Sequence, residues 1–231
     1  MNTLINYVLD FVFPRRCCVC GVALNRSENH ICISCAIDIP VTNLHRVPFN
    51  RVEQLFAGHV RMERASALFY YHKQSPYSSI LHDLKYRNTP QLGEFIAKKL
   101  SVRLQLDGFF HDIDYIIPIP LHYTKESERG YNQSLYISKG ISDTSGIPII
   151  RNTLIAKEAH DTQTHKHRNE RWQNTRDIFD VKHSEQINGK HILLVDDVIT
   201  TGATMISAAK TITESATDVK ISALSLALAN D

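Results

Sequence analysis

The sequence lacks a long run of apolar residues, and it lacks a strong excess of charge of either sign. Its 231 residues include 26 Lys and Arg and 24 Asp and Glu, which leaves a formal net charge of only +2. A field this weak argues against a protein that binds nucleic acid over its whole surface, although it leaves room for a local basic patch. Because no run is long enough to span a bilayer, we predict a cytoplasmic protein with no transmembrane segment.

The most apolar stretch, MNTLINYVLDFVFP at residues 1–14, lacks the features of a signal peptide. It has no basic N-terminal region and no small-residue cleavage site, it contains Asp10, and it is shorter than a membrane span. Leu4, Ile5 and Val8 recur at helical spacing, which predicts a short amphipathic helix packed on the body of the protein. Contact with a membrane surface is the alternative.

Cysteine is absent outside residues 17–35, where all five cysteines lie. Four of them form two C-x2-C pairs, and two such pairs can bring four thiolates onto one ion. Soft thiolates select zinc over magnesium or calcium, so we predict a structural zinc site with Cys18 as a bystander. The predicted ligands are Cys17, Cys20, Cys32 and Cys35. Two disulfides are the alternative, which the absence of a secretion signal disfavours.

Strands and helices alternate along the remainder of the sequence after an aperiodic stretch that reaches about residue 62. We predict strands at 67–72, 114–120, 190–195 and 219–228, an extended segment at 147–157, and helices after Ser75-Pro76, at 91–105, from about Tyr131, and at 203–215. The polar segment 160–177 is predicted to be a long mobile loop. This alternation predicts an α/β fold, a parallel-rich sheet flanked by helices, with a small N-terminal four-cysteine zinc module.

The predicted divisions of the chain are an amphipathic helix at 1–14, the zinc module and a linker at 15–60, and the main domain at 61–231. Within the main domain, Asp196 and Asp197 directly follow the apolar run at 192–195. Ligands bind at the carboxyl ends of strands in open α/β sheets. Burying two adjacent carboxylates costs several kcal/mol each unless they have partners. The vicinal hydroxyls of a ribose, or a hydrated divalent cation, would be suitable partners.

A short turn rich in threonine follows the two aspartates. Glycine lets the backbone approach a ligand closely, and threonine hydroxyls together with the amides of a helix start form a site for a phosphate dianion. The residues predicted to bind phosphate are Thr200, Thr201, Gly202, Ala203 and Thr204. The alternative is a strand followed by a capped helix, with two acids that have no role.

These motifs resemble those of a known family. ILLVDDVITTGAT at 192–204 resembles the phosphoribosyl pyrophosphate signature of type I phosphoribosyltransferases. The wider chain resembles the ComF family of competence-associated proteins, over nearly its whole length. The stretches that carry this resemblance are FPRRCCVCG, CISC, LKYRN (84–88), IIPIPLH (116–122), RGYNQS (129–134), and the spaced residues Thr162, Gln163, Arg171, Asn174 and Phe179.

The resemblance implies a role for each predicted site residue. Asp196 and Asp197 would bind the ribose 2′- and 3′-hydroxyls, the turn at 200–204 would bind the 5′-phosphate, and 160–177 would be a lid over the reacting centre. Arg171 on this lid is predicted to be catalytic, together with the two aspartates. The residues predicted to face the pyrophosphate are Lys85, Arg87, Ile119, Pro120, Leu121 and Arg129.

Several of these cations have a simpler alternative. Lys85 and Arg87 could lie at an exposed helix end, which favours cations, and Arg129 could belong to a helix cap. Lys166 and Arg168 on the lid could contact a leaving pyrophosphate or could simply be solvated.

The implied function is a phosphoribosyltransferase-like protein that binds phosphoribosyl pyrophosphate with magnesium, associated with natural competence and with the uptake or processing of transforming single-stranded DNA. In a transfer, pyrophosphate would leave C1′ and a nitrogen nucleophile would attack, but the acceptor cannot be identified from the residues. The alternatives are an inactive phosphoribosyl pyrophosphate sensor and a zinc-dependent adaptor for DNA or a competence helicase or DNA-processing protein. Arg15, Arg16 and Arg26 are candidates for contacts with single-stranded phosphates.

Overall fold

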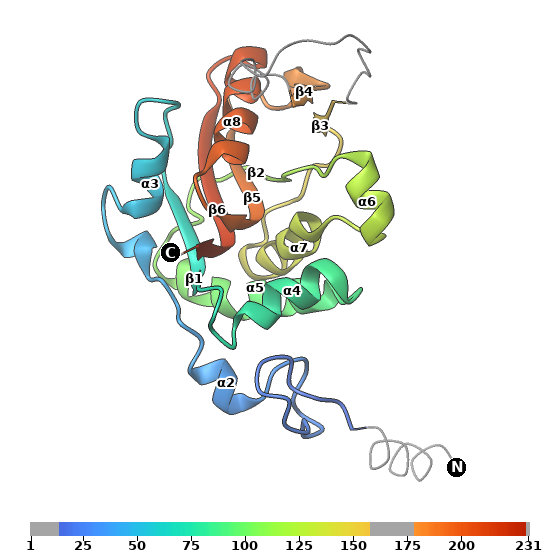
Figure 1. Ribbon diagram of the computed structural model, residues 1–231. Helices are drawn as coiled ribbons and strands as arrows, with labels where there is room; N and C mark the ends of the chain where they lie inside the picture. Colours follow the sequence, from blue (N-terminus) through green and yellow to red (C-terminus); the bar gives the residue numbers. More distant parts are fainter. Residues whose placement is uncertain (1–13, 158–177, 230–231) are drawn as a thin grey trace, which may run out of the picture.

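A parallel sheet of four strands lies at the centre of the computed structural model, which describes residues 14–157 and 178–229 (Figure 1). The strand order is β1-β6-β5-β2, and all three neighbouring pairs are parallel. The strands are β1 (Ala65–Tyr71), β2 (Tyr115–Pro118), β5 (His191–Ile199) and β6 (Lys220–Ala229). A separate antiparallel pair consists of β3 (Leu154–Ala156) and β4 (Phe179–Val181). The predicted α/β class with a parallel-rich sheet is therefore confirmed.

Strand β5 is apolar on both sides because both faces of the sheet are covered. Leu193 and Val195 belong to one hydrophobic core, whereas Ile192 and Leu194 belong to a second core, and all four are fully buried. The alternation of side chains along a strand divides this apolar run between the two faces. The strand that carries the two aspartates is therefore packed from both faces of the sheet.

On the first face of the sheet, where Leu193 and Val195 are buried, three helices pack closely on one another (Figure 1). These helices are α4 (Ser78–Tyr86), α5 (Pro90–Leu106) and α7 (Gln133–Ser145). Gly140 of α7 allows the approach of α5, because a Cβ atom there would lie 2.2 Å from the carbonyl oxygen of Glu94 and 2.8 Å from the amide of Lys98. Both atoms are backbone, so any larger residue at 140 would push the two helices apart.

The second face is covered by α3 (Arg51–Phe56) and α8 (Ala203–Ser215), which supply Val52 and Met205 to the second core. The sequence predicted no helix at α3. The side chain of Asn50 accepts hydrogen bonds from the amides of Val52 and Glu53, and the Glu53 side chain accepts one from the Asn50 amide. This reciprocal cap stabilises a helix too short to show an apolar period.

Other element boundaries also differ from the predictions. Strand β5 continues past Asp196 and Asp197 to Ile199, so the aspartates lie within the strand and not after its end. An additional helix, α6 (Tyr123–Arg129), precedes α7. Helix α7 begins at Gln133 because the side chain of Asn132 caps it by accepting from the Ser134 amide. In the predicted extended segment 147–157, Ile149 forms a parallel bridge with Ile116 and β3 is the only strand.

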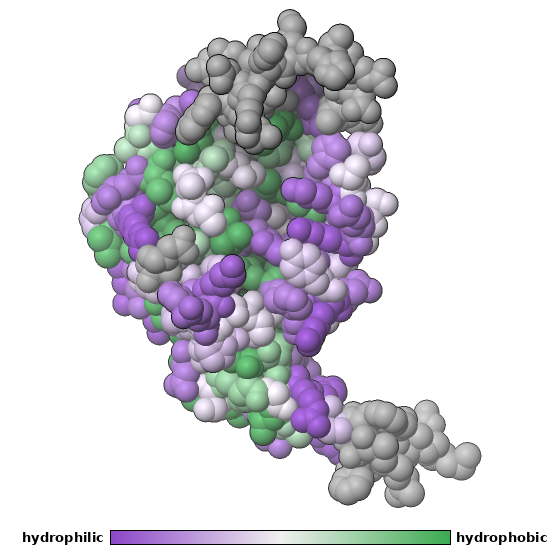
Figure 2. Space-filling view, viewed as in Figure 1, coloured by the Kyte–Doolittle hydropathy of each residue, from purple (hydrophilic) through white to green (hydrophobic). Residues whose placement is uncertain are grey.

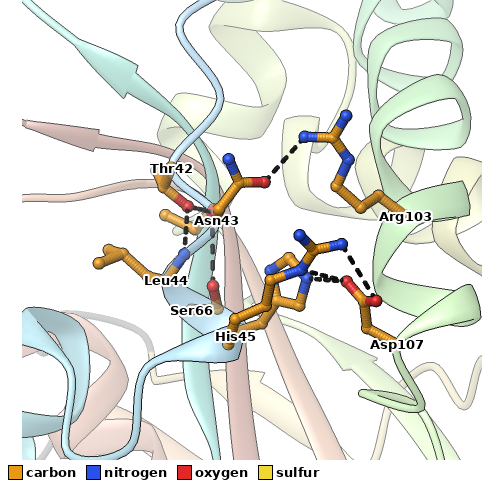
Figure 3. A network of polar contacts seen from close by, with 9 residues as sticks. Thr42, Asn43, Leu44, His45, Ser66, Arg103 and Asp107 are labelled. Carbon is orange, nitrogen blue, oxygen red and sulfur yellow. Dashed lines mark hydrogen bonds and ion pairs between the residues drawn. The ribbon is translucent and has the colours of Figure 1, made fainter.

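Residues 40–46 run along the edge of β1 and join it to α5 (Figure 3). Val41 bridges Phe69 on β1, and the hydroxyl of Thr42 donates to the carbonyl oxygen of Ala67. On the α5 side, Arg103 donates to the side chain of Asn43 at 2.9 Å. This segment therefore belongs structurally to the sheet. The boundary between residues 60 and 61 stays a prediction.

Asp107, directly after α5, closes the same network (Figure 3). Arg46 donates two hydrogen bonds to its carboxylate, at 2.7 and 3.1 Å, and the Nε2 atom of His45 lies 2.8 Å from it. The hydrogen bonds from Arg46 and His45 lower the pKa of Asp107 to about 2. The carboxylate is therefore ionised across the neutral range and keeps these contacts.

Within residues 14–157 and 178–229, no helix is both long enough and apolar enough to cross a membrane. The helix predicted at residues 1–14 lies outside the described residues except for Pro14.

Candidate functional site

The four-cysteine segment (residues 14–37) brings together the predicted metal ligands. The Sγ atoms of Cys17, Cys20, Cys32 and Cys35 all lie within 4.8 Å of one another, and those of Cys20 and Cys32 are 3.7 Å apart. A tetrahedral zinc with ligands at about 2.3 Å requires sulfur atoms about 3.8 Å apart. The cluster therefore fits a metal ion such as zinc.

The positions of the thiols separate the predicted ligands from the fifth cysteine, because the group of sulfur atoms that could hold one ion contains all four predicted ligands and not Cys18. Burial raises the pKa of the Cys17 thiol, but amide hydrogen bonds, including that from Cys32 at 3.4 Å, outweigh it and lower the pKa to about 7. Burial, and then the nearby charges of Cys17 and Asp83, raise the pKa of Cys18 to about 12. Burial also raises the pKa of the Cys35 thiol, so these pKa directions do not distinguish ligand from bystander, and it is the position of Cys18 outside the cluster that agrees with the bystander role predicted for it.

The acid pair (Asp196 and Asp197) lies where the chain leaves the sheet in opposite directions. From β5 the chain passes through α8 to β6 on one side. From β2 it passes through α7 to the segment at Ile149, which pairs with Ile116 on the other side. Such a reversal leaves a crevice outside the carboxyl ends of the two strands, and ligands of open α/β sheets bind there.

Each carboxylate of the acid pair has a partner from a different helix. The Oδ1 atom of Asp196 accepts hydrogen bonds from the hydroxyl of Ser134 on α7 at 2.9 Å and from the Asp197 amide at 2.8 Å. The Oδ2 atom of Asp197 lies 3.0 Å from the ammonium of Lys85 on α4. Burial, and then the charge of Asp197, raise the pKa of Asp196 to about 7. A carboxyl group poised to titrate near neutral pH is common at functional sites.

The phosphate turn (residues 200–204) follows the acid pair and opens α8. Gly202 is the N-cap residue with φ of 75°, and it has no side chain to accept from the first amides of the helix. The Ala203 amide donates to the hydroxyl of Thr201 at 3.5 Å, and the helix start with its positive dipole end has the character of sites that bind anions. A cavity of about 40 Å³ is lined by Asp196 and by all five residues of the turn. The structure therefore brings the predicted phosphate residues to one side of the acid pair.

The predicted pyrophosphate loop follows β2, the strand next to β5. Ile119 is buried; its amide donates to the carbonyl oxygen of Val195 at 2.8 Å, and its carbonyl accepts from Asn132 at 3.0 Å. Pro120 and Leu121 line a separate cavity of about 240 Å³. The loop is thus held beside the acid pair by a backbone contact to β5 and by the side chain of Asn132, while its role toward a diphosphate stays a prediction.

Three predicted cations near the crevice already have contacts. Lys85 pairs with Asp197, Arg87 pairs with Asp83 at 3.2 Å, and Arg129 donates to the side chain of Gln133 at 3.0 Å. Figure 2 shows mainly hydrophilic side chains over α4 and α6, which carry these cations. Arg171, Lys166 and Arg168 lie outside the described residues.

A comparison with protein families matches the chain over residues 91–224, more than half its length, to the phosphoribosyl transferase domain. The chain belongs to this family. Its sequence is 29% identical over 138 residues to Competence protein F of Haemophilus influenzae, covering 58% of this chain and 60% of that protein. It is 33% identical over 111 residues to Competence protein ComFC of Bacillus subtilis, covering 48% of this chain and 43% of that protein.

The competence-protein relatives place this phosphoribosyltransferase-family chain in the ComF branch, as its motifs predicted. The match spans less than two thirds of the length of each of these two relatives. Among solved structures, the allosteric regulatory enzyme of purine biosynthesis aligns with a TM-score of 0.38 and 19% identity, covering 57% of this chain and 26% of that one.

Two residues that contact the candidate site were not predicted from the sequence. Ser134, the hydrogen-bond donor to Asp196, lies in the RGYNQS stretch, so the motif was noticed but its serine was not assigned a role. Leu55 of α3 lies against the phosphate turn: a Cβ atom placed on Gly202 would be 3.4 Å from the Cβ atom of Leu55. No local signal could reveal this second contact, since it depends on how α3 packs.

Proposed function

We propose that the protein binds phosphoribosyl pyrophosphate in the crevice at the ends of β5 and β2 and acts as a phosphoribosyltransferase. Asp196 and Asp197 bind the ribose diol, and the phosphate turn binds the 5′-phosphate. The observation that carries this proposal is that Asp196 and the whole turn line one cavity. A carboxylate that can accept from the diol and a turn that can donate to the phosphate therefore border the same space, which supports the proposal.

In the proposed transfer, the bond between C1′ and the diphosphate oxygen breaks, its electron pair leaves with the diphosphate, and a nitrogen nucleophile bonds to C1′. Magnesium would be held mainly by the diphosphate oxygens and by water, and it would neutralise the leaving group. The crevice of this chain fixes the ribose, so its contribution is mostly positioning. Arg171, which lies outside the described residues, is proposed to contact the leaving diphosphate.

Thermal unfolding tests the binding proposal. A ligand at a hundred times its Kd stabilises the folded state by about 2.7 kcal/mol, which for a chain of this size raises Tm by roughly 5–10 °C. We expect this shift with phosphoribosyl pyrophosphate and Mg²⁺, and we expect it to vanish in the double variant Asp196→Asn, Asp197→Asn. Asp143→Asn is the matched control, since Asp143 pairs with Lys98 on exposed helix surface. A shift that survives in the double variant contradicts the proposed site.

Release of pyrophosphate separates transfer from binding alone. Incubation with phosphoribosyl pyrophosphate and a panel of nucleobases and amines should release pyrophosphate with at least one acceptor. If the ligand raises Tm but no acceptor gives release above the rate without acceptor, the chain is a phosphoribosyl pyrophosphate sensor.

We also propose a role in the uptake or processing of transforming DNA, which the names of the competence-protein relatives support. The predicted DNA contacts Arg15 and Arg16 have structural contacts: Arg15 donates to the carbonyls of Asn25 and Glu28, and Arg16 to that of Gly21. Retention on single-stranded DNA should fall steeply with salt if phosphates are bound. Retention that is independent of salt would contradict this role.

A second candidate function is an adaptor role for the four-cysteine segment. Ile33 and Ile37 of α2 (Ile33–Ile37) are 59% and 75% exposed, and Figure 2 shows a hydrophobic patch over this end of the molecule. We propose zinc as the ion that folds the segment and presents this patch to a helicase or DNA-processing protein. Ile37→Glu should abolish co-elution with such a partner, and unchanged co-elution would exclude α2 as the docking surface.

A further inference from the structure

The ammonium of Lys85 contacts the acid pair directly. It lies 3.0 Å from Oδ2 of Asp197, and the two side chains are only 23% and 13% exposed. Removing one partner of a poorly solvated ion pair leaves the other charge without compensation. Burial and the charge of Asp197 raise the pKa of Asp196, while the charge of Lys85 works in the opposite direction. Lys85 therefore favours the ionised form of Asp196.

Helix α4 holds Lys85 in place from its C-terminal end. Ile80 and Leu84 are fully buried and fix the helix against the first face of the sheet. The carbonyl oxygen of Leu84 accepts a hydrogen bond from the hydroxyl of Tyr131, and that of Asp83 accepts one from Thr89 at 2.9 Å. The carbonyl of Asp83 also accepts from the Arg87 amide at 3.1 Å, and the contact from Tyr131 gives a partner to Leu84 in the last turn, where carbonyl groups lack partners within the helix. The backbone on both sides of Lys85 is thus anchored.

The other end of α4 is attached to the four-cysteine segment. The hydroxyl of Tyr77, the residue before α4, donates to the carbonyl oxygen of Cys35 at 3.1 Å. Cys17 and Cys32 belong to the same hydrophobic core as Ile80. Because α4 is a short helix of nine residues bonded at both ends, a shift of the four-cysteine segment would move the helix that carries Lys85.

We propose that Lys85 is a positioning residue of the ribose site, which orients Asp197 toward the ribose diol, and that the four-cysteine segment fixes Lys85 through α4. This inference rests on the proposed function, because it assigns a role within the same crevice. It differs from the sequence-based interpretation, in which Lys85 contacts the diphosphate. A residue that acts through Asp197 affects every ligand that has the ribose diol, whether or not it carries a diphosphate.

Calorimetric affinities for ribose 5-phosphate and for phosphoribosyl pyrophosphate with Mg²⁺ distinguish these two roles. We expect Lys85→Met to weaken both ligands by a similar factor of about ten, because a charge-assisted contact to Asp197 is lost. Lys85→Arg should restore part of the affinity. Lys98→Met, which breaks an exposed ion pair with Asp143, is the matched control and should change neither affinity.

The outcomes separate the inference from the proposed function. If Lys85→Met weakens phosphoribosyl pyrophosphate and leaves ribose 5-phosphate unchanged, Lys85 contacts the diphosphate and the inference is overturned while the binding site stands. If the unmodified protein binds neither ligand, the proposed function itself fails.

The pH dependence of ribose 5-phosphate binding gives a readout that a purely structural role would not move. The charged groups that meet here are Asp196 and Asp197 of β5 and Lys85 of α4, with the neutral hydroxyl of Ser134 from α7. Affinity should fall as the pH drops and Asp196 becomes protonated. Without the ammonium the pKa of Asp196 rises further, so the midpoint in Lys85→Met should move to higher pH. An unchanged midpoint overturns the positioning role.

A double-mutant cycle tests the link through α4. Tyr77→Phe removes the hydrogen bond to Cys35 and should weaken ribose 5-phosphate binding by about threefold when Lys85 is present. In the Lys85→Met background the same substitution should have no further effect, because coupled residues are not additive. Additive losses, or no loss from Tyr77→Phe alone, overturn the link between the four-cysteine segment and the ribose site.

Discussion

The four-cysteine segment and the strand that carries the acid pair place their functional groups by opposite means. In the four-cysteine segment, few residues are buried, and the four thiols converge from loops and one short helix. In β5, Ile192 to Val195 are fully buried, and strands pair on both sides. The first region adds only a few residues to the core, so we expect a bound ion to stabilise it, whereas the second is formed by the sheet before any ligand binds.

The two sites should therefore affect the free energy of unfolding in opposite directions. A structural metal contributes its binding free energy to folding. The acid pair does the reverse, because two adjacent carboxylates on a buried strand repel each other and lower stability until a ligand or a cation such as Lys85 compensates them. One site should therefore collapse when its ligand is withdrawn, and the other should become more stable when its charge is removed.

Withdrawal of the metal should have the largest effect. Structural zinc contributes about 10–16 kcal/mol in zinc-finger peptides, so a chelator should unfold the four-cysteine segment almost completely. Hydrogen exchange should show lost protection over residues 14–37 and retained protection over β5. Metal analysis should give one ion per chain, which Cys20→Ser reduces and the neighbouring Cys18→Ser does not. Equal protection in both regions after chelation would break the comparison.

Crowding between α5 and α7 should produce the next largest loss of stability, and it should leave the metal site of the four-cysteine segment unaffected. Gly140→Ala places a Cβ atom 2.2 Å from the carbonyl oxygen of Glu94, and separating the two helices should cost about 3 kcal/mol. The Tm should fall by roughly 6–12 °C with metal content unchanged. Gly146→Ala is the matched control: it has open space but a φ of 75°, so it should lose only about 1 kcal/mol. If Gly140→Ala and Gly146→Ala lost the same stability, the close approach of α5 to α7 would not account for the loss at Gly140.

Removal of one charge from the acid pair should give the smallest effect, and it should be a gain. The pKa of Asp196 is raised from 3.8 to about 7, so the folded state favours the protonated form. Stability is therefore lost as the pH rises from about 4 through 7, and Asp196→Asn abolishes that loss. At pH 8 the variant should be about 1–2 kcal/mol more stable than the unmodified protein.

The control for this prediction is pH itself. Thermal unfolding near pH 4 should show no difference between Asp196→Asn and the unmodified protein, because both then carry a neutral group. A variant that is less stable at pH 8 would mean that the carboxylate of Asp196 contributes to the fold. That result would place the acid pair with the four-cysteine segment, as a site that holds its surroundings together.

Local sequence was enough to predict which residues of each candidate site lie close together. The spacing of the cysteines and the order of apolar run, acid pair and phosphate turn are each contained in about twenty residues, and the structure brings each set together. The partners of these groups could not be predicted in the same way. Lys85 and Ser134 reach the acid pair only because α4 and α7 pack on the same face of the sheet. Helix α3 was missed because its cap, not an apolar period, defines it.

The segment at residues 40–42 covers an edge of the sheet and should therefore protect the protein from aggregation. It bonds to the free side of β1, where Tyr70 donates to Pro40 and Thr42 donates to Leu68, while Pro148 accepts from Ile116 at the opposite margin. Uncovered β-margins recruit other chains into aggregates, and a strand as apolar as Ala-Leu-Phe-Tyr would do so readily. A shortened protein should therefore begin before Ile39 and not at residue 61, so that this margin of the sheet stays covered.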